Sequence, residues 1–298
     1  MTCSNSWTAV MLRELTTFKF DEPGCRGNAS TVRTQYNLHL MRPRIDELPA
    51  VSVSETLSLK RGIVDLWYLF PESIGTLELN RVRDVLMSSD ERKRCEAFRF
   101  ERDRLLFIVS RVAVRMVLSR YAPAAPAAWV FTADQHGKPR VVSPDHSPRL
   151  HFNLTNTRGL VVCAVSVAHD AVGVDAELVD AARPTHWLAN RAFSPSEVQL
   201  LDAMPPAEQA QGFFEYWTLK ESYTKARGLG LSMPLDQFSF KIDDYGISAT
   251  FGERVGDDPA AWRFSLLTTS QCHSIAISAK TGGAELSLRA TDVMHFVT

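Results

Sequence analysis

The same order of predicted elements occurs twice in this 298-residue chain, at a separation of roughly one hundred residues. In each copy a strand-like run comes first, followed by a capping-box sequence, a long helix with an apolar stripe, and further strand-like runs. The opening runs are 62–70 and 171–178, and the capping boxes are 88–91 and 194–197, each with serine first and glutamate last. A capping box starts a helix because both side chains satisfy backbone N–H groups that the first turn leaves unpaired. The sequence therefore predicts an α+β protein built as a pseudo-twofold pair of similar halves.

The two long helices differ in what their polar residues offer. The first is predicted over 102–120, and the second begins at Phe213 and ends before Gly228, since glycine is the common helix terminator. Arg104 and Arg111 lie on the polar face of the first helix. Guanidinium groups bind phosphate through paired hydrogen bonds, so this face could hold a phosphate. A solvated helix face is the alternative, because acidic residues lie among the arginines.

The domain boundaries follow from where this pattern begins and ends. Polar and turn residues interrupt every apolar cluster in residues 1–60, which we interpret as an N-terminal extension. The first half is predicted over 61–170 and the second over 171–280, and 281–298 form a tail without a recognisable pattern.

Composition indicates an ordinary globular protein, because 45% of the residues are hydrophobic and 22% are charged. The net charge of −1 argues against a general polyanion binder, so we expect no nucleic acid partner. The five cysteines have no paired spacing, which suits a reducing compartment. No apolar run reaches the ~18 residues of a membrane span, and the first 20 residues lack the features of a signal peptide. We expect a soluble, cytoplasmic protein.

A pair of carboxylates is the first candidate for chemistry. Asp175 and Glu177 alternate within the apolar run Gly-Val-Asp-Ala-Glu, so in a strand both side chains lie on one face. Neighbouring carboxylates repel unless a cation or a proton relieves them. Magnesium suits such a pair, because it takes a few carboxylates and keeps water or phosphate as its other ligands. A solvated edge strand is the alternative, but the apolar setting and Gly173, which permits close backbone approach, favour a metal-binding pair.

Glu221 and Lys225 lie four residues apart on the second long helix and therefore share a face. Alone, this spacing is typical of a solvated surface ion pair. The carboxylate pair about 45 residues earlier raises a second possibility, in which Glu221 joins it as a third acidic ligand. The chain contains no HExxH, GxSxG or GxxxxGK[ST] sequence, so zinc proteases, nucleophile-elbow hydrolases and P-loop NTPases lose support. The residues alone predict a candidate magnesium and phosphate site.

Four blocks, in order, resemble the Sfp-type 4'-phosphopantetheinyl transferases. Residues 137–139 resemble the family's GKP turn, and Phe-Asn-Leu-Thr-Asn-Thr at 152–157 resembles its FNLSHS strand. Residues 173–177 fit GxDxE, and 217–225 fit WxxKExxxK. The likeness covers about 62–280, and the succession of the last two blocks is its most specific part.

The resemblance implies two α+β halves with coenzyme A bound in the cleft between them. It implies transfer of 4'-phosphopantetheine from coenzyme A to a serine of an acyl or peptidyl carrier protein, with release of adenosine 3',5'-bisphosphate. By this resemblance Asp175, Glu177 and Glu221 hold magnesium on the diphosphate of coenzyme A. Glu221 would also be the general base, and Lys225 would face the phosphates or the leaving group.

The resemblance also implies a set of coenzyme A contacts. These are Lys138, Pro139, Thr155, Asn156 and Lys225 in the pocket, with Arg104 and Arg111 as candidates for the 3'-phosphate. Asn156 stands where the family pattern usually has histidine, and an amide cannot carry the positive charge of a protonated imidazole. We therefore expect a weaker contact at that position.

Two other functions are considered beside the transferase. One is a non-catalytic module that binds coenzyme A or a carrier protein, and the other is an unrelated magnesium-dependent phosphoester enzyme. All of Asp175, Glu177, Glu221 and Lys225 are present, which favours the enzyme over the module. The family implies a carrier of fatty acid, polyketide or nonribosomal peptide synthesis. We expect a monomer, because one chain already supplies both walls of the cleft.

Overall fold

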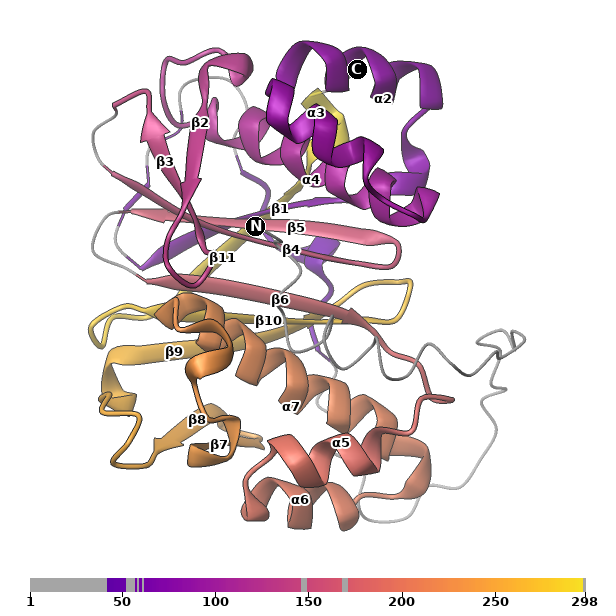
Figure 1. Ribbon diagram of the computed structural model, residues 1–298. Coiled ribbons are helices and arrows are strands. Elements are labelled where there is room, and N and C mark those ends of the chain that lie inside the picture. The colour runs from indigo at the N-terminus through magenta and orange to yellow at the C-terminus, as the bar shows by residue number, and fades with distance from the viewer. Residues whose placement is uncertain are drawn as a thin grey trace.

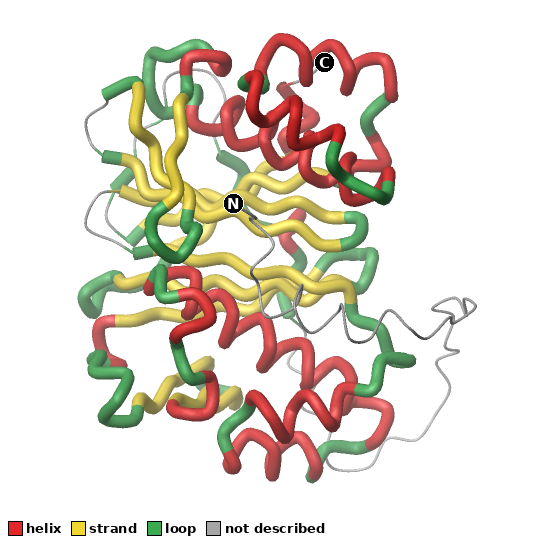
Figure 2. The backbone as a smooth tube through the Cα atoms, viewed as in Figure 1, coloured by secondary structure: helices red, strands yellow, loops and turns green. Residues whose placement is uncertain are grey.

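The predicted duplication is present in the three-dimensional structure. A computed structural model describes residues 42–51, 57, 59, 60, 62–145, 149–167 and 171–296. Its elements confirm the α+β class and run twice through one order, in which a strand precedes three helices and two β-hairpins. Figures 1 and 2 show the strands at the centre of the molecule, with α2, α3 and α4 on one side and α5, α6 and α7 on the other.

The element bounds show the correspondence between the halves. The first half contains β1 (Ile63–Leu69), α2 (Thr76–Leu86), α3 (Ser89–Glu96), α4 (Glu101–Leu118), β2 (Val130–Ala133), β3 (Pro139–Ser143), β4 (Leu150–Thr157) and β5 (Leu160–Val167). The second contains β6 (Val172–Leu178), α5 (Thr185–Ala192), α6 (Pro195–Asp202), α7 (Pro206–Arg227), β7 (Phe238–Asp243), β8 (Gly246–Phe251), β9 (Trp262–Thr268) and β10 (His273–Lys280). A last strand, β11 (Ser287–Asp292), follows.

The two main sheets have the same strand order. One sheet runs β11-β1-β5-β4 and the other β6-β10-β9, so β6 corresponds to β1, β10 to β5 and β9 to β4. The hairpins β2-β3 and β7-β8 form two small separate sheets. Strand β4 lies beside β6, so the edge of the first sheet faces the edge of the second (Figure 1).

Three hydrophobic clusters hold these layers together. One packs the first sheet against α2, α3 and α4 around residues such as Trp67 and Val109. Another packs α7 and the strands of the second half around Trp217 and Tyr223. The third lies between the two sheets and includes Leu66 and other apolar residues of β1, β5, β6 and β10. Burial of this shared apolar surface joins the halves into one unit.

Both predicted capping boxes are confirmed, and each supports a buried ion pair. Ser88 and Glu91 cap α3, and Ser194 caps α6 together with Glu197. Glu91 also accepts from Arg115 of α4 at 2.8 Å, and Glu197 accepts from Lys220 of α7 at 2.8 Å. In each half, one glutamate therefore caps a helix and forms an ion pair with a basic residue of the helix that follows.

The arginine face of α4 is less exposed than the sequence suggests. Arg115 is buried, paired with Glu91, and its guanidinium carbon lies 4.9 Å from the ring centre of Phe131. Arg115 is therefore neither solvated nor available to bind a phosphate, because its charge is already neutralised inside the fold.

The long second helix begins earlier than predicted. Helix α7 starts at Pro206 instead of Phe213, and it ends at Arg227 with Gly228 in the left-handed conformation, φ 68°. Proline is favoured in the first turn of a helix because its missing N–H would be unpaired there. The predicted end is confirmed.

The chain ends contribute contacts for which the sequence shows no pattern. Within 281–298, strand β11 pairs in parallel with the outer edge of β1. In the described part of the N-terminal extension, Arg42 forms a two-hydrogen-bond ion pair with Glu215 of α7. Ile45 is buried between the sheets, and Ala290 N of β11 donates to Pro49 O at 2.9 Å. This segment therefore runs from the second half to the first.

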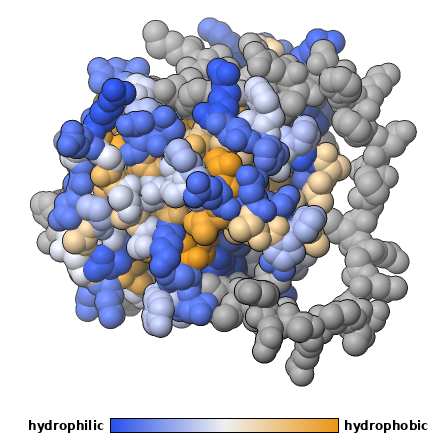
Figure 3. All heavy atoms as spheres, turned by 90° about the horizontal axis from the view of Figure 1, so that it is seen from below, coloured by the Kyte–Doolittle hydropathy of each residue, from blue (hydrophilic) through white to orange (hydrophobic). Residues whose placement is uncertain are grey.

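The surface seen from below in Figure 3 belongs mainly to the second half and shows hydrophilic residues with apolar ones between them. Helices α5 and α6 leave Trp187 and Leu200 about half exposed, at 51% and 45%. None of the helices within the described residues is long and apolar enough to cross a membrane.

Candidate active site

The site depends on a close approach between β6 and α7. A Cβ atom at Gly173 would overlap the carbonyl oxygen of Ser222 and lie 2.5 Å from Ala226 N, so only glycine fits there. This contact brings one face of α7 directly against one face of β6. Gly173 was predicted to permit close backbone approach, and the partner in that approach is the helix that carries Glu221 and Lys225.

The three predicted acidic ligands lie together at this contact. Asp175 and Glu177 are 4% and 8% exposed on β6, and Glu221 is 3% exposed on α7. Lys225, one turn after Glu221, donates from Nζ to Asp175 Oδ1 at 2.6 Å and to Thr155 Oγ1 at 3.0 Å. The ion pair made by Lys225 therefore joins the helix to the acidic strand, and the surface ion-pair alternative is wrong.

Burial and mutual repulsion alter how these carboxyl groups titrate. Desolvation, followed by the charge of Asp175, raises the pKa of Glu177 to about 7 and that of Glu221 to about 8. Burial also raises the pKa of Asp175, although Lys225 acts in the opposite direction. The carboxyl groups of this cluster therefore hold protons more readily than exposed carboxyl groups do.

The donor set fits a hard dication. Asp175 Oδ2 and Glu221 Oε1 are buried without a hydrogen-bond partner, so two oxygens remain available for a ligand. Within the described ranges, no three His, Cys, Asp or Glu side chains form a group that could hold a metal ion by itself. Magnesium does not need such a group, because it binds through one or two carboxylates and retains water and substrate phosphate.

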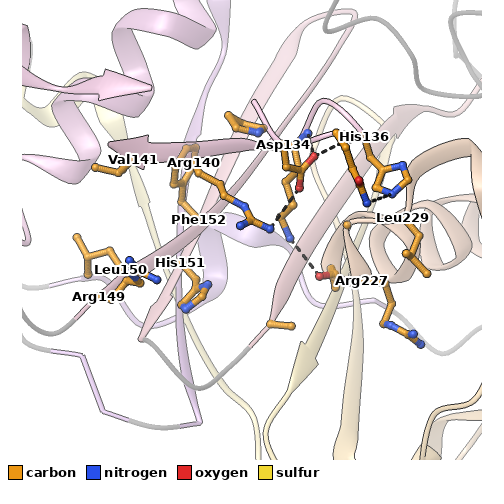
Figure 4. A pocket seen from close by; sticks show the side chains of 16 residues that line it. Asp134, His136, Arg140, Val141, Arg149, Leu150, His151, Phe152, Arg227 and Leu229 are labelled. Carbon is orange, nitrogen blue, oxygen red and sulfur yellow. Dashed lines mark hydrogen bonds and ion pairs between the residues drawn. The ribbon is translucent and has the colours of Figure 1, made fainter. Parts of the chain in front are cut away.

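Two of the predicted coenzyme A contacts line a cavity between the halves. The cavity measures about 770 Å³, and Lys138 and Pro139 line it together with the start of β4 and the end of α7. Figure 4 shows Arg149 and His151 on one side and Arg227 on the other. Arginines and histidines outnumber the single acidic residue, Asp134, in the lining, so an anionic ligand suits it.

Lys138 links the halves at this cavity. Its Nζ donates to the carbonyl oxygens of Lys225 and Ala226 at 2.7 and 3.1 Å, which are among the last carbonyls of α7. Burial lowers its pKa to about 8. The hairpin turn of the first half therefore contacts the helix end of the second half, directly after Lys225.

The remaining predicted contacts divide into near and distant residues. Thr155 donates to Asp175 Oδ1 at 3.2 Å, so it belongs to the acidic cluster. Asn156 lies on the opposite face of β4 and donates to Ser110 Oγ of α4 at 3.2 Å. Arg111, next to Ser110, has a buried Nε without a hydrogen-bond partner.

Arg104 lies apart from these residues. Its side chain is 41% exposed and pairs with Glu101 in the first turn of its own helix. The structure therefore provides no contact between Arg104 and the acidic cluster.

Two side chains of β4 reach the acidic strand and were not predicted. Thr157 Oγ1 donates to Glu177 Oε2 at 3.1 Å, and Asn153 Oδ1 accepts from Val174 N at 2.8 Å. The alternation of polar residues at 153, 155 and 157 is a visible sequence signal, because these positions share one face of a strand. The partner of that face could not be identified without the position of β6.

Two family models match this chain, one in each half. Residues 171–278 match the 4'-phosphopantetheinyl transferase superfamily, and 78–168 match the N-terminal part of a 4'-phosphopantetheinyl transferase. The chain is 32% identical over 160 residues to a 4'-phosphopantetheinyl transferase of Bacillus subtilis, which covers 54% of this chain and 68% of that protein. It is similarly 32% identical over 161 residues to 4'-phosphopantetheinyl transferase Sfp of Bacillus subtilis strain 168, with the same two coverages.

Solved structures give a more distant likeness. A holo-(acyl-carrier-protein) synthase from Bacillus anthracis, in complex with CoA (3',5'-ADP), is 16% identical with a TM-score of 0.30. The match covers 37% of this chain and 93% of that one. On the family matches and the two Bacillus subtilis relatives, the chain belongs to the Sfp-type 4'-phosphopantetheinyl transferase family.

Proposed function

We propose that this protein transfers 4'-phosphopantetheine from coenzyme A to a serine of an acyl or peptidyl carrier protein, releasing adenosine 3',5'-bisphosphate. The observation that carries this proposal is the buried contact between β6 and α7. There three carboxylates and one lysine meet, and the residues that follow Lys225 on the same helix line a cavity between the halves. Family membership supplies the reaction class, and the geometry supplies the residues.

We propose that Asp175, Glu177 and Glu221 hold a magnesium ion. When bound, this ion would offset negative charge on the coenzyme A diphosphate and on the departing nucleotide. The two unpartnered oxygens, Asp175 Oδ2 and Glu221 Oε1, are the donors that are free in this arrangement.

Glu221 and Lys225 then have separate roles. Glu221, directly or through water, accepts the proton of the attacking serine hydroxyl. The serine oxygen forms a bond to the phosphorus that carries pantetheine, and the bond from that phosphorus to the bridging oxygen of the diphosphate breaks. Lys225, held by Asp175 and Thr155, presents an ammonium group to the phosphate oxygens.

Coenzyme A is proposed to lie between the halves. Lys138 and Pro139 line the cavity at the end of α7, and Thr155 borders the acidic cluster. Asn156, which donates to Ser110 Oγ of α4, is proposed as a further contact. Arg111 is the better candidate for the 3'-phosphate, because its buried Nε lies 3.9 Å from Glu91 without a hydrogen bond, whereas Arg104 is exposed and hydrogen-bonded to Glu101.

A mass-shift assay tests the activity. Purified protein with magnesium and coenzyme A should add one phosphopantetheine group to at least one of several apo carriers from fatty acid, polyketide and nonribosomal peptide systems. Unmodified mass for every carrier would contradict the proposal. A non-catalytic binding module would still bind coenzyme A in a calorimetric titration, so titration of the same sample separates that alternative.

We further propose that the protein works as a monomer in the cytoplasm. Both walls of the cleft come from one chain, so no second copy is needed to complete the site. The thiols of Cys95 and Cys163 are free and buried, and burial raises the pKa of both, which suits a reducing compartment. Light scattering at assay concentration checks the monomer, and a dimer that persists on dilution would contradict it.

A further inference from the structure

One face of β4 is aligned against the acidic strand across the boundary between the halves. Asn153, Thr155 and Thr157 alternate along β4, so their side chains lie on the same face. Their partners are Val174 N, Asp175 Oδ1 and Glu177 Oε2, at 2.8, 3.2 and 3.1 Å, in matching order along β6. Three alternate residues of β4, in the first half, therefore each contact β6, the acidic strand of the second half.

These contacts take the place of a continuous sheet. Strands β4 and β6 belong to separate sheets, and β6 forms its backbone ladder with β10. Its other edge faces β4, where Asn153 accepts the backbone N–H of Val174 through a side-chain oxygen. The amide thus binds β6 at the residue before Asp175, although β4 and β6 are not paired within one sheet.

Each hydroxyl binds one oxygen of its carboxylate, and on Asp175 Lys225 donates to the same oxygen. Thr155 donates to Oδ1 of Asp175, and Oδ2 of the same group has no partner. Thr157 donates to Oε2 of Glu177. A hydrogen bond on one oxygen fixes the rotation of a carboxylate, and outer partners of this kind orient metal ligands.

From this alignment we infer that Asn153, Thr155 and Thr157 are positioning residues that set the Asp175 and Glu177 carboxylates for the cation. The inference rests on the proposed function, because it concerns how the same site is held. It adds that residues of the first half, which supply no metal ligand, determine the metal affinity of the second.

Thr157 gives the clearest test of the three. Thr155 also contacts Lys225, and Asn153 is 4% exposed, so changes there disturb more than the carboxylates. Thr157 is only half-buried, and its hydroxyl donates to Glu177. Thr157→Val removes the hydroxyl, Thr157→Ser keeps it, and Thr250→Val makes the same change at an exposed strand position of β8 as the matched control.

The readout is Mn²⁺ affinity, followed by electron paramagnetic resonance on the full chain with coenzyme A and without a carrier, so that no turnover occurs. Thr157→Val should weaken Mn²⁺ binding by about tenfold, the lower range for loss of an outer partner. Thr157→Ser should stay within about twofold of the wild type, as should Thr250→Val. Thermal unfolding of each variant without metal verifies that the fold is retained, and Thr157→Ala serves as the second hydroxyl-free variant.

The outcomes separate this inference from the function on which it rests. If the wild type binds Mn²⁺ and both Thr157→Val and Thr157→Ala bind it equally well, the positioning role is wrong and the metal site stands. If Thr157→Ser loses affinity as much as Thr157→Val, packing and not the hydroxyl is responsible, and the inference is again overturned. If the wild type binds no Mn²⁺, the metal assignment in the proposed function fails first.

Discussion

Corresponding strands of the two halves carry an aspartate on the face that packs against the helices, and the two aspartates have opposite surroundings. Asp65 of β1 is fully buried and accepts from Arg289 at 2.6 and 2.8 Å and from Tyr121 Oη at 2.7 Å. Asp175 of β6 is nearly as buried, yet its Oδ2 has no partner. The fold binds both oxygens of Asp65, whereas Asp175 is paired with Lys225 through Oδ1 alone and shares the charge of that lysine with Glu177 and Glu221.

The difference arises at the strand edges, because the helix supports are alike. Glu91 with Arg115 and Glu197 with Lys220 form the same junction in both halves. The outer edge of β1, however, pairs with β11, which brings Arg289 to Asp65. The corresponding edge of β6 faces hydroxyl and amide side chains of β4, which orient a carboxylate without neutralising it. One half of the duplicated scaffold thus holds a structural ion pair, and the other holds the cluster of three buried carboxyl groups.

Substitutions in the acidic cluster, at Asp175 or Glu221, should have the strongest effect, and that effect should be on catalysis. Asp175→Ala or Glu221→Ala should reduce transfer by at least about 10²–10³-fold, the scale for losing one group that stabilises transition-state charge. Folding should change little, because burial raises the pKa of both carboxyl groups, so that their charged forms destabilise the folded state. Mass-shift kinetics and urea unfolding measure the two quantities. Near-normal turnover in either variant would show that the acidic cluster is not the reactive one.

Substitution of Asp65 should show the reverse, with a loss of stability and little loss of transfer activity. Asp65→Ala should lower the free energy of unfolding by about 3 kcal/mol, the lower value for breaking a buried pair because Arg289 is partly exposed. Transfer measured well below the unfolding transition should persist. Urea unfolding of Asp65→Ala and Asp175→Ala side by side makes the comparison. Equal destabilisation in the two variants would contradict the distinction between the halves.

Stabilisation by coenzyme A should depend on the acidic cluster of Asp175, Glu177 and Glu221. Coenzyme A at about 100 times its dissociation constant should stabilise the protein by about 2.7 kcal/mol, and we expect this stabilisation to require magnesium. Thermal unfolding with coenzyme A, magnesium or both provides the measurement, with Glu221→Ala as the control that should not respond to magnesium. Full stabilisation without magnesium would place the nucleotide away from the carboxylates.

The close contact at Gly173 is expected to have a moderate effect on stability. Gly173→Ala should cost about 1–3 kcal/mol, because the added methyl group overlaps the backbone of α7 and must push the helix from β6. Transfer should fall as well, since Glu221 and Lys225 move with the helix. Gly75→Ala is the matched control, because nothing lies within 4 Å of a Cβ there. Comparable stability in the two variants would show that α7 does not need this contact.

The smallest expected effect concerns the contact of Lys138 with the end of α7. Its pKa is lowered to about 8 by burial, so between about pH 8 and its unfolded value near 10.5 the unfolded chain binds more protons than the folded one. This residue should therefore make stability rise with pH across that window. Lys138→Met should flatten the rise by on the order of 1 kcal/mol relative to the wild type. Urea unfolding at pH 7.5 and 9.5 checks it, and parallel pH profiles would contradict a buried ammonium.

Local sequence patterns were enough to predict the elements that depend on neighbouring residues. The two capping boxes, the end of α7 at Gly228 and the alternation of Asp175 and Glu177 are local patterns, because each hydrogen bond or face is decided within a few residues. The repeated order of such patterns was enough for the α+β halves. The motif blocks then assigned the acidic residues to the correct strand and helix.

Which of these elements contact one another is visible only in the three-dimensional structure. Arg289 forms an ion pair with Asp65, which is 224 residues away in the sequence. Arg115 forms an ion pair with Glu91, which is 24 residues away and also caps another helix. Neither partner can be read from local spacing, because long-range contacts follow from sheet order and burial. For the same reason, the sequence could place Thr157 on one face of a strand without revealing Glu177 opposite. The position of β4 against β6 made that threonine part of the site.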